Sequence, residues 1–175
     1  PKTGKSKLTR QIILSVLQGE DLMNKFKSGQ GQVLYIPLEE GLAPINRQLK
    51  KMLLNRKIED HSFLNSLFIV QRPDLEEKYL NIEEFIQEYY NTQKHLKLVV
   101  LDPLAGLMFE DAKSAYNYLY DYKQTRRLQD IAIDLGISIV AIHHNRKSES
   151  KKAIQKMSGT QGITGAAEAL WVLER

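Results

Sequence analysis

The sequence predicts an α/β fold, in which a mainly parallel β-sheet carries helices on both faces. Short apolar runs alternate along the chain with longer segments of helical period, which is the pattern of a parallel sheet with crossover helices. The chain has 175 residues, of which 42% are hydrophobic, and this length and composition suit one globular domain. We therefore expect a single domain over residues 1–175.

Five short apolar runs are the candidate strands of this sheet. Each is bounded by polar or turn-forming residues, and most are rich in Val, Ile and Leu, as buried parallel strands are. They cover residues 33–37, 67–70, 98–101, 137–142 and 169–173.

Helical periodicity fills the segments between these strands. Leu8, Ile12 and Val16 recur at i, i+4 and i+8, which predicts a helix that buries this face. A spacing of i, i+3, i+4 and i+7 predicts a second amphipathic helix on Leu128, Ile131, Ala132 and Leu135. Further helices are expected over residues 42–56 and 82–92.

Two connections are long for such a fold, in which most loops have about 2 to 6 residues. They span residues 103–115 and 145–162, and each follows a candidate strand. Open parallel sheets bind their ligands at the carboxyl ends of the strands. We therefore expect the functional site at that edge of the sheet.

The composition excludes several classes of site. The chain has no cysteine, which excludes disulfide frameworks, thiolate zinc sites, iron–sulfur clusters and cysteine nucleophiles. No apolar run approaches the roughly 20 residues that a membrane-spanning helix needs, and the first residues lack the apolar core of a signal peptide. We therefore expect a cytoplasmic protein with no membrane partner.

Residues 145–162 hold the whole excess of positive charge. The formal net charge of the chain is +4, and this segment alone contributes five basic residues and one acidic residue. Elsewhere 20 basic and 20 acidic residues balance. Such a local excess predicts a local anionic partner rather than a general affinity for polyanions.

The first chemical motif is Thr3-Gly4-Lys5-Ser6, directly before the first predicted helix. In the phosphate loop G-x-x-x-x-G-K-[ST], backbone N–H groups surround the phosphates, the lysine reaches the β and γ oxygens and the hydroxyl binds Mg²⁺. The helix N-terminus adds partial positive charge. The alternative is a solvated helix start that Ser6 caps. The residues expected to bind ATP are Lys2, Thr3, Gly4, Lys5, Ser6 and Lys7.

Both ends of the chain look cut. It opens on PKTGKSKL, within the phosphate-loop motif, and stops on the strand-like WVLER. We therefore expect a domain that is incomplete at both ends and belongs to a larger protein.

The second motif is LVVLDP, an apolar strand that ends at Asp102. In P-loop NTPases a carboxylate in this position, beside the phosphate loop, helps to hold Mg²⁺. The motif therefore predicts a magnesium site that consists of Ser6 and Asp102. The alternative is an aspartate that caps the following loop, next to Pro103.

The third motif is VLYIPLEEG, a strand followed by Glu39 and Glu40. ATP hydrolysis needs a group that orients and polarises the attacking water, and a carboxylate on a neighbouring strand tip can do so. Adjacent residues of an extended backbone face opposite ways, so only one of the two can point at the γ-phosphate. We favour Glu39 as the catalytic carboxylate, and Glu40 remains the alternative.

The fourth motif, SIVAIHHNRK, brings His143 and His144 to the same edge of the sheet. One of them can hydrogen-bond the γ-phosphate, and we favour His144 for that role. At least one of the pair is expected either to support the site through another residue or to be a hydrogen-bonded histidine of the core. Metal ligation is not predicted, because His61 and His95 lie in unrelated segments and no spacing typical of zinc sites occurs.

The basic segment NRKSESKKAIQKMSGTQG has three interpretations. It is a solvated loop, a contact to the backbone of single-stranded nucleic acid, or the source of a cation for a neighbouring subunit's ATP site. It contains no aromatic residue, so phosphate contact is favoured over base stacking as the mode of DNA binding. The candidates for these contacts are Arg146, Lys147, Lys151, Lys152 and Lys156.

Taken together, these motifs resemble those of a known family. GKS, YIPLEEG, LVVLDPLAGL, SIVAIHHNRK and SGTQGITGAAEALWVL, in this order and spacing, resemble the RecA-type ATPase core of the RepA-like hexameric replicative helicases. The sequence is more distantly similar to the DnaB, RadA and KaiC groups. The resemblance covers nearly all of the chain.

The resemblance implies a RecA-like P-loop NTPase core, ATP and Mg²⁺ as cofactors, a homo-oligomeric ring and single-stranded DNA as partner. By motif, it implies that Lys5 contacts the phosphates, Ser6 and Asp102 hold Mg²⁺, Glu39 is catalytic and His144 senses the γ-phosphate. Residues 145–162 match the position of a DNA-binding loop. The arginine finger matches no single residue, and Arg146 and Arg175 remain candidates.

We therefore expect Mg²⁺-dependent ATP hydrolysis that drives an oligomeric DNA helicase or a related motor in replication, recombination or a mobile element. One alternative is a regulatory ATPase similar to KaiC that does not translocate on DNA. Another is a nucleotide-binding assembly module without turnover.

Overall fold

Four of the five predicted strands form one parallel sheet in the computed structural model, which describes residues 4–71, 81–104, 118–143 and 165–173. Their order across the sheet is β2-β1-β3-β4, and each neighbouring pair is parallel. The predicted α/β fold class is therefore confirmed. The strands are β1 (Gln32–Pro37), β2 (Leu67–Ile69), β3 (Leu96–Asp102) and β4 (Ser138–Ala141).

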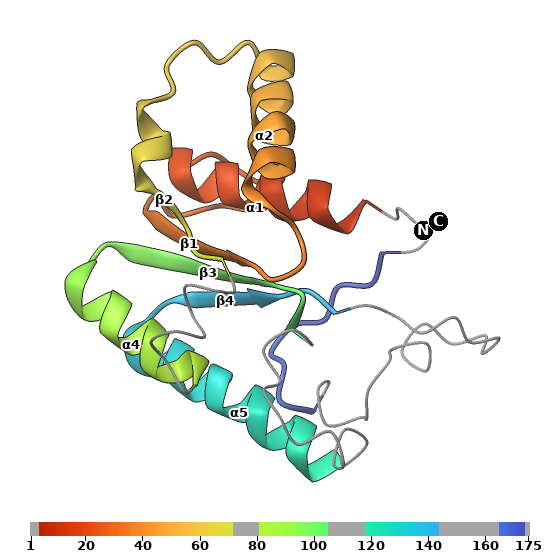
Figure 1. The fold of residues 1–175 in the computed structure, drawn as a ribbon, viewed down its shortest axis with the longest axis vertical. Coiled ribbons are helices and arrows are strands. Elements are labelled where there is room, and N and C mark those ends of the chain that lie inside the picture. The colour runs from red at the N-terminus through yellow and green to blue at the C-terminus, as the bar shows by residue number, and fades with distance from the viewer. Residues whose placement is uncertain (1–3, 72–80, 105–117, 144–164, 174–175) are drawn as a thin grey trace, which may run out of the picture.

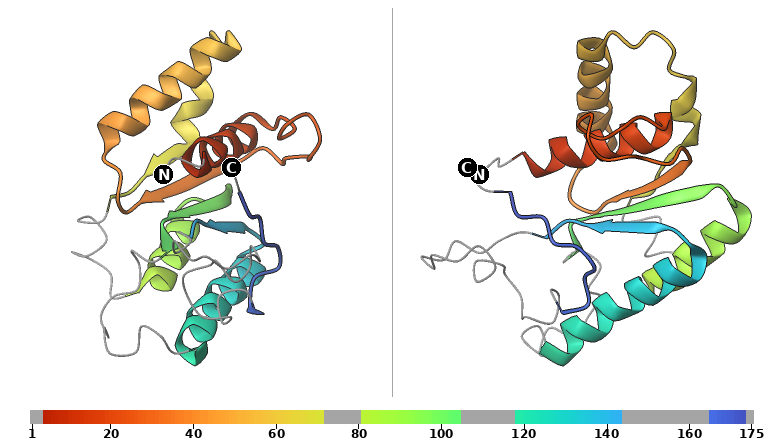
Figure 2. Two further views of the ribbon diagram at one scale, coloured as in Figure 1. Left: turned by 90° about the vertical axis from the view of Figure 1, so that its right-hand side faces the viewer. Right: turned by 180° about the vertical axis from the view of Figure 1, so that it is seen from behind.

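Helices cover both faces of this sheet (Figures 1 and 2). One face carries α1 (Lys5–Gln18) and α2 (Leu42–Arg56), and the other carries α4 (Ile82–Thr92) and α5 (Tyr118–Leu135). A short 3-10 helix, η1 (Ser62–Ser66), leads into β2. The boundaries predicted for α2 and α4 are confirmed.

The strand side chains alternate between two cores, because successive residues of a strand point to opposite faces. The core under α4 and α5 takes Leu34, Ile36, Val99 and Leu101 from the strands. The core under α1 and α2 takes Val33, Tyr35, Leu98 and Val100. The predicted face of α5 is confirmed, since Leu128 is buried and the other three residues pack against the first core.

The buried face of α1 differs from the prediction. Leu8, Ile12 and Val16 are only half-buried. Ile12 and Val16 still pack against the core under α1 and α2, so the predicted face is partly right. The fully buried face lies beside it and includes the polar residues Thr9 and Arg10, which an apolar pattern assigns to solvent. The side chains that α1 buries are Thr9, Arg10, Ile13, Leu14, Ser15 and Leu17.

The fifth predicted strand, residues 169–173, is wrong. This segment has no assigned secondary structure and pairs with no strand among the described residues, and Trp171 is 56% exposed. A strand requires a hydrogen-bonding neighbour, which an apolar sequence alone does not supply. Instead, the segment lines a cavity of about 560 Å³ that lies between it, β4 and α5.

The carboxyl ends of the central strands lie level with one another. Pro37 of β1 pairs with Asp102 of β3, and the amide N–H of Leu38 donates to the Asp102 carbonyl at 2.7 Å. On the other side, the N–H of Ile142 donates to the carbonyl of Leu101 at 2.9 Å. The residues that follow β1, β3 and β4 therefore meet at one edge of the sheet.

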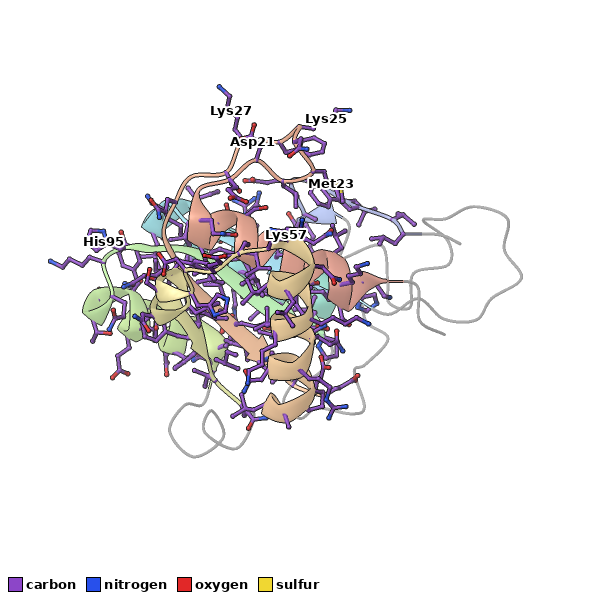
Figure 3. The ribbon with its side chains drawn as sticks, turned by 90° about the horizontal axis from the view of Figure 1, so that it is seen from above. Asp21, Met23, Lys25, Lys27, Lys57 and His95 are labelled. Carbon is purple, nitrogen blue, oxygen red and sulfur yellow. The ribbon has the colours of Figure 1, made fainter. Side chains whose placement is uncertain are left out.

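The loop between α1 and β1 lies at the opposite edge, because α1 runs back along the sheet from the carboxyl ends of the strands. Figure 3 shows Lys25 and Lys27 of this loop projecting from the body of the molecule. Both long loops of the sequence analysis lie mainly outside the described residues. No helix in the described part of the chain is long and apolar enough to cross a membrane.

Candidate functional site

Helix α1 begins at the carboxyl edge of the sheet with an uncapped N-terminus. Its N-cap residue is Gly4, which has φ 93° and makes no side-chain capping bond. A left-handed conformation of this kind favours glycine, since a Cβ atom would strain it. The alternative that Ser6 caps the helix is therefore wrong. Within the described residues no side chain of the N-cap binds the N–H groups of the first turn, so these groups and the positive end of the helix dipole can face an anion.

Lys5 joins this helix start to the end of β4. Its Nζ donates a hydrogen bond to the carbonyl oxygen of His143 at 3.0 Å. The side chain thus spans from the first residue of α1 to His143, which directly precedes His144, the favoured candidate for contact with the γ-phosphate. Ser6 and Lys7, the next two residues of the helix, are exposed.

Asp102 stands at the end of β3, beside the hydroxyl of Tyr35. The Tyr35 hydroxyl donates to Asp102 Oδ2 at 3.4 Å. Burial raises the pKa of the Tyr35 phenol well above its usual value, and the neighbouring Asp102 carboxylate raises that pKa further. The phenol is therefore protonated at neutral pH and serves as a donor to Asp102.

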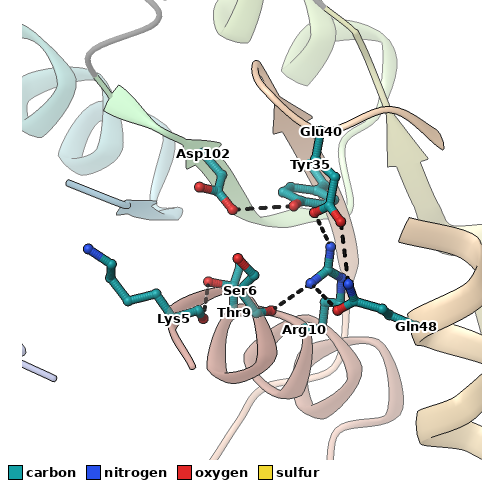
Figure 4. A network of polar contacts seen from close by, with 8 residues as sticks. All are labelled: Lys5, Ser6, Thr9, Arg10, Tyr35, Glu40, Gln48 and Asp102. Atoms are coloured by element: carbon teal, nitrogen blue, oxygen red, sulfur yellow. Dashed lines mark hydrogen bonds and ion pairs between the residues drawn. The ribbon is translucent and has the colours of Figure 1, made fainter. Parts of the chain in front are cut away.

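The Ser6 hydroxyl and the Asp102 carboxylate fit a magnesium ion. Figure 4 shows Ser6 on the first turn of α1, on the side of the helix that faces Asp102 and Tyr35. Both groups are hard oxygen donors, which Mg²⁺ prefers, and Mg²⁺ commonly takes only one or two protein ligands beside phosphate oxygens and water. The pair could hold the ion next to the uncapped end of α1.

The two carboxylates that follow β1 have different surroundings. Glu39 is exposed, whereas Glu40 is partly buried and forms an ion pair with Arg10 of α1. Figure 4 shows the Glu40 carboxylate directed at Arg10 and at Gln48 of α2. The Gln48 amide donates to Glu40 Oε1 at 3.4 Å.

Arg10 is the functional candidate that the sequence reasoning missed. It is fully buried, and its Nη1 donates to the Ser6 carbonyl at 3.1 Å and to Gln48 Oε1 at 2.7 Å. A signal for it was present in the sequence: Arg10 lies at i with Ile13 and Leu14 at i+3 and i+4, so a cation shares an apolar helix face. A buried cation requires an anionic partner, which the Glu39–Glu40 pair offers.

The 560 Å³ cavity adjoins this site on the β4 side. Lys5 and Thr9 of α1 stand at one wall, and apolar side chains of β4, α5 and residues 166–173 form most of the rest. Its size and its mainly apolar lining are both typical of small-molecule sites. The cavity is therefore separate in character from the polar edge where Ser6 and Asp102 lie.

Several predicted site residues lie outside the described part of the chain. The structure brings Gly4, Lys5, Ser6, Asp102 and the Glu39–Glu40 pair to one edge of the sheet. The predicted site residues that the structure does not describe are Lys2, Thr3, His144, Arg146, Lys147, Lys151, Lys152 and Lys156.

Helix α1 begins after a glycine, carries a lysine and a serine in its first turn and faces a carboxylate at the end of a central strand. This arrangement is typical of P-loop ATPases. A comparison with protein families agrees, since the family model of the AAA domain matches residues 1–150. The chain belongs to the AAA domain family. It is thus a P-loop ATPase of the AAA type, a class of proteins that bind nucleotides.

The range that matches the AAA domain includes both the start of α1 and the end of β3, which meet at the polar edge of the sheet. It extends from before Gly4 to beyond Asp102 and contains Arg10. The end of the range, residue 150, falls inside the basic segment 145–162.

Proposed function

We propose that this AAA domain protein hydrolyses ATP with Mg²⁺ and couples the reaction to movement on DNA, as a ring-forming motor of the RepA-like helicase type. Residues 1–175 are taken as one RecA-like ATPase domain. The observation that carries the ATPase part is the convergence of the uncapped α1 N-terminus, Ser6 and Asp102 at one edge of the sheet.

In this proposal, the first turn of α1 binds the phosphates. Its N–H groups and Lys5 contact the β and γ oxygens, and the amine of Lys5 exchanges the carbonyl of His143 for a phosphate oxygen. Ser6 and Asp102 would hold Mg²⁺, which would neutralise part of the negative charge of the phosphates.

Glu39 orients the attacking water. The water oxygen bonds to the γ-phosphorus while the bond from that phosphorus to the β–γ bridging oxygen breaks, which releases ADP and inorganic phosphate. A carboxylate on the neighbouring strand tip can accept a hydrogen bond from this water. His144 is assigned to the γ-phosphate, where its hydrogen bond reports whether ATP or ADP is bound.

The DNA part of the proposal depends on charge. The five cations Arg146, Lys147, Lys151, Lys152 and Lys156 give the segment 145–162 the whole positive excess of the chain. Lys or Arg contacts to phosphates release counterions, so binding weakens as salt rises. A ring would bring this segment from several subunits to one strand of DNA.

Steady-state ATP hydrolysis, with and without single-stranded DNA, tests this proposal. We expect DNA to stimulate hydrolysis, and we expect a variant with Lys151, Lys152 and Lys156 changed to Gln to keep basal hydrolysis but lose the stimulation. Its DNA affinity should also depend less steeply on salt concentration than that of the wild type. Glu149→Gln is the matched control, since it changes charge in the same segment without removing a cation.

A wild-type rate of ATP hydrolysis that does not change when DNA is added would contradict the proposed motor function. It would instead favour a regulatory ATPase similar to KaiC. Tight nucleotide binding without any turnover would favour an assembly module, and in that case Glu39→Gln would change no rate.

A further inference from the structure

Arg10 has an unusual position for a charged side chain. It has 0% exposure, and it contacts three segments: the Ser6 carbonyl in its own helix, Gln48 in α2 and Glu40 after β1. Figure 4 shows its guanidinium between these partners. One buried group therefore joins the phosphate-binding helix to the segment that carries the two glutamates.

Stability is a weak reason for this arrangement. Arg10 loses all of its hydration on burial, while the partly exposed Glu40 keeps some of its own. Well-packed apolar side chains of similar volume are often as stable as such a pair or more so. The geometry of the guanidinium offers another reason, because its planar fork fixes the direction of each acceptor. Such a group holds its partners in one relative position.

The backbone that these contacts hold in place includes Glu39. On one side of Glu39, the N–H of Leu38 donates to the Asp102 carbonyl at 2.7 Å. On the other side, the Glu40 side chain is held by Arg10 and Gln48. Neighbouring Cα atoms are about 3.8 Å apart, so two fixed neighbours leave the backbone of Glu39 little freedom.

We propose that Arg10 is a positioning residue, which fixes Glu40 and thereby sets the distance between Glu39 and the phosphate-binding turn of α1. This inference rests on the proposed ATPase function, with Glu39 as the water-orienting group. In this inference Glu40 is the anchor, the residue through which Arg10 holds the backbone, and it takes no part in the hydrolysis itself.

The test compares Arg10→Met, Glu40→Leu and the double variant Arg10→Met/Glu40→Leu with the wild type. Glu40→Leu leaves the fully buried Arg10 without its anionic partner and can fail to fold for that reason. Arg10→Met leaves Glu40 partly exposed and in contact with Gln48, so it is the milder single variant. The double variant removes both charges. Its remaining partners, Gln48 and the Ser6 carbonyl, belong to exposed residues that water can reach. It is therefore expected to fold, with a thermal midpoint close to that of the wild type.

In the double variant we expect kcat for ATP hydrolysis to fall about tenfold, the cost of roughly 1.4 kcal/mol in the transition state. The dissociation constant of a fluorescent ATP analogue should stay within about threefold of the wild type. Where the single variants fold, their kcat should fall as far as that of the double variant, because each cuts the same link. Glu39→Gln should lower kcat further than any of them.

Arg126→Met is the matched control. Arg126 forms an exposed ion pair with Asp130 within α5, at 2.9 Å. Exposed pairs contribute little, so kcat and the thermal midpoint of this variant should not change.

Wild-type kcat in a folded double variant would overturn the inference, since the pair would then be structural alone. An equal loss of nucleotide affinity and kcat would also overturn it, because the pair would then shape the phosphate site itself. A larger loss in Glu40→Leu than in Glu39→Gln would identify Glu40 as the chemical group and contradict the anchor. Absence of ATP hydrolysis in the wild type would overturn the proposed function and this inference together.

Discussion

Tyr35 links the buried sheet to the Asp102 carboxylate through one hydroxyl group. Its ring is 1% exposed in the core under α1, and its hydroxyl donates to Asp102 Oδ2. Groups that hydrogen-bond a metal-ligating carboxylate orient it, and their loss commonly weakens metal binding about 10- to 100-fold. The proposed role of Asp102 as a Mg²⁺ ligand therefore predicts that Tyr35 orients the carboxylate for the metal.

Tyr35→Phe should raise the Mg²⁺ concentration that gives half-maximal ATP hydrolysis by about tenfold. The substitution removes only the hydroxyl, so the core packing of the ring is kept. A magnesium titration of the hydrolysis rate measures the effect.

Tyr89→Phe is the control for this substitution. The Tyr89 hydroxyl is buried and has no hydrogen-bond partner among the described residues. Its loss should leave the magnesium dependence unchanged. The same magnesium dependence in Tyr35→Phe and the wild type would show that Tyr35 does not act on a metal ligand.

Glu39→Gln should lower kcat by about 10²- to 10⁴-fold, because the amide cannot act as the base toward the attacking water. ATP affinity should stay unchanged, since the substitution leaves the phosphate-binding turn intact. Hydrolysis and nucleotide binding, measured on the same preparation, separate the two effects. A parallel loss of affinity and rate would argue that Glu39 binds nucleotide rather than water.

At the scale of single residues, sequence motifs predicted the positions of Lys5, Ser6 and Asp102. Arg10 could not be paired from the sequence, since its partner Glu40 is 30 residues away and the contact depends on how α1 packs against the sheet. The choice between Glu39 and Glu40 was open for the same reason. The different surroundings of the two carboxylates follow from tertiary packing.

Among the secondary-structure elements, the turn into β1 requires a glycine at residue 31. A Cβ atom there would lie 2.9 Å from Lys97 Cβ and 3.0 Å from the His95 carbonyl oxygen at the start of β3. These distances are shorter than Cβ contacts normally are, and the carbonyl belongs to the backbone. The glycine thus lets β1 and β3 begin side by side.

Gly31→Ala should destabilise the protein by about 1–3 kcal/mol, the usual cost of overpacking. Gly29→Ala is the matched control from the same loop, because a Cβ there has open space around it. It should change stability by less than about 0.5 kcal/mol. Denaturant unfolding of both variants measures the difference, and equal midpoints would contradict the packing described at residue 31.

Four strands and the buried face of α5 could be predicted because local patterns determine them. Apolar runs of four to six residues mark strands in parallel sheets, and α5 places its apolar residues on one stripe. The face of α1 was predicted only in part: Ile12 and Val16 pack against the core, but Thr9 and Arg10 are buried more deeply with the apolar side chains. Residues 169–173 show the other limit, since strand formation depends on a partner that local sequence does not reveal.

For the whole molecule, the sheet order brings the site together. The order β2-β1-β3-β4 places β3 between β1 and β4, so Asp102 stands between the glutamate pair and the segment that Lys5 contacts. Helices α1 and α2 on one face complete the site through Arg10 and Gln48. The proposed ATPase site thus depends on the carboxyl edge of the sheet, which α1, α2, β1, β3 and β4 form together.

The most direct test of this account is the binding of ATP, with Mg²⁺ present, measured by calorimetry on the wild type and on Lys5→Ala. A hydrogen bond to a charged group contributes about 1.5–3 kcal/mol, so Lys5→Ala should weaken binding at least about tenfold. Lys27→Ala, at the opposite edge of the sheet (Figure 3), should bind as the wild type does. Equal ATP affinity in Lys5→Ala and the wild type would contradict the central claim that the N-terminus of α1 is the nucleotide site.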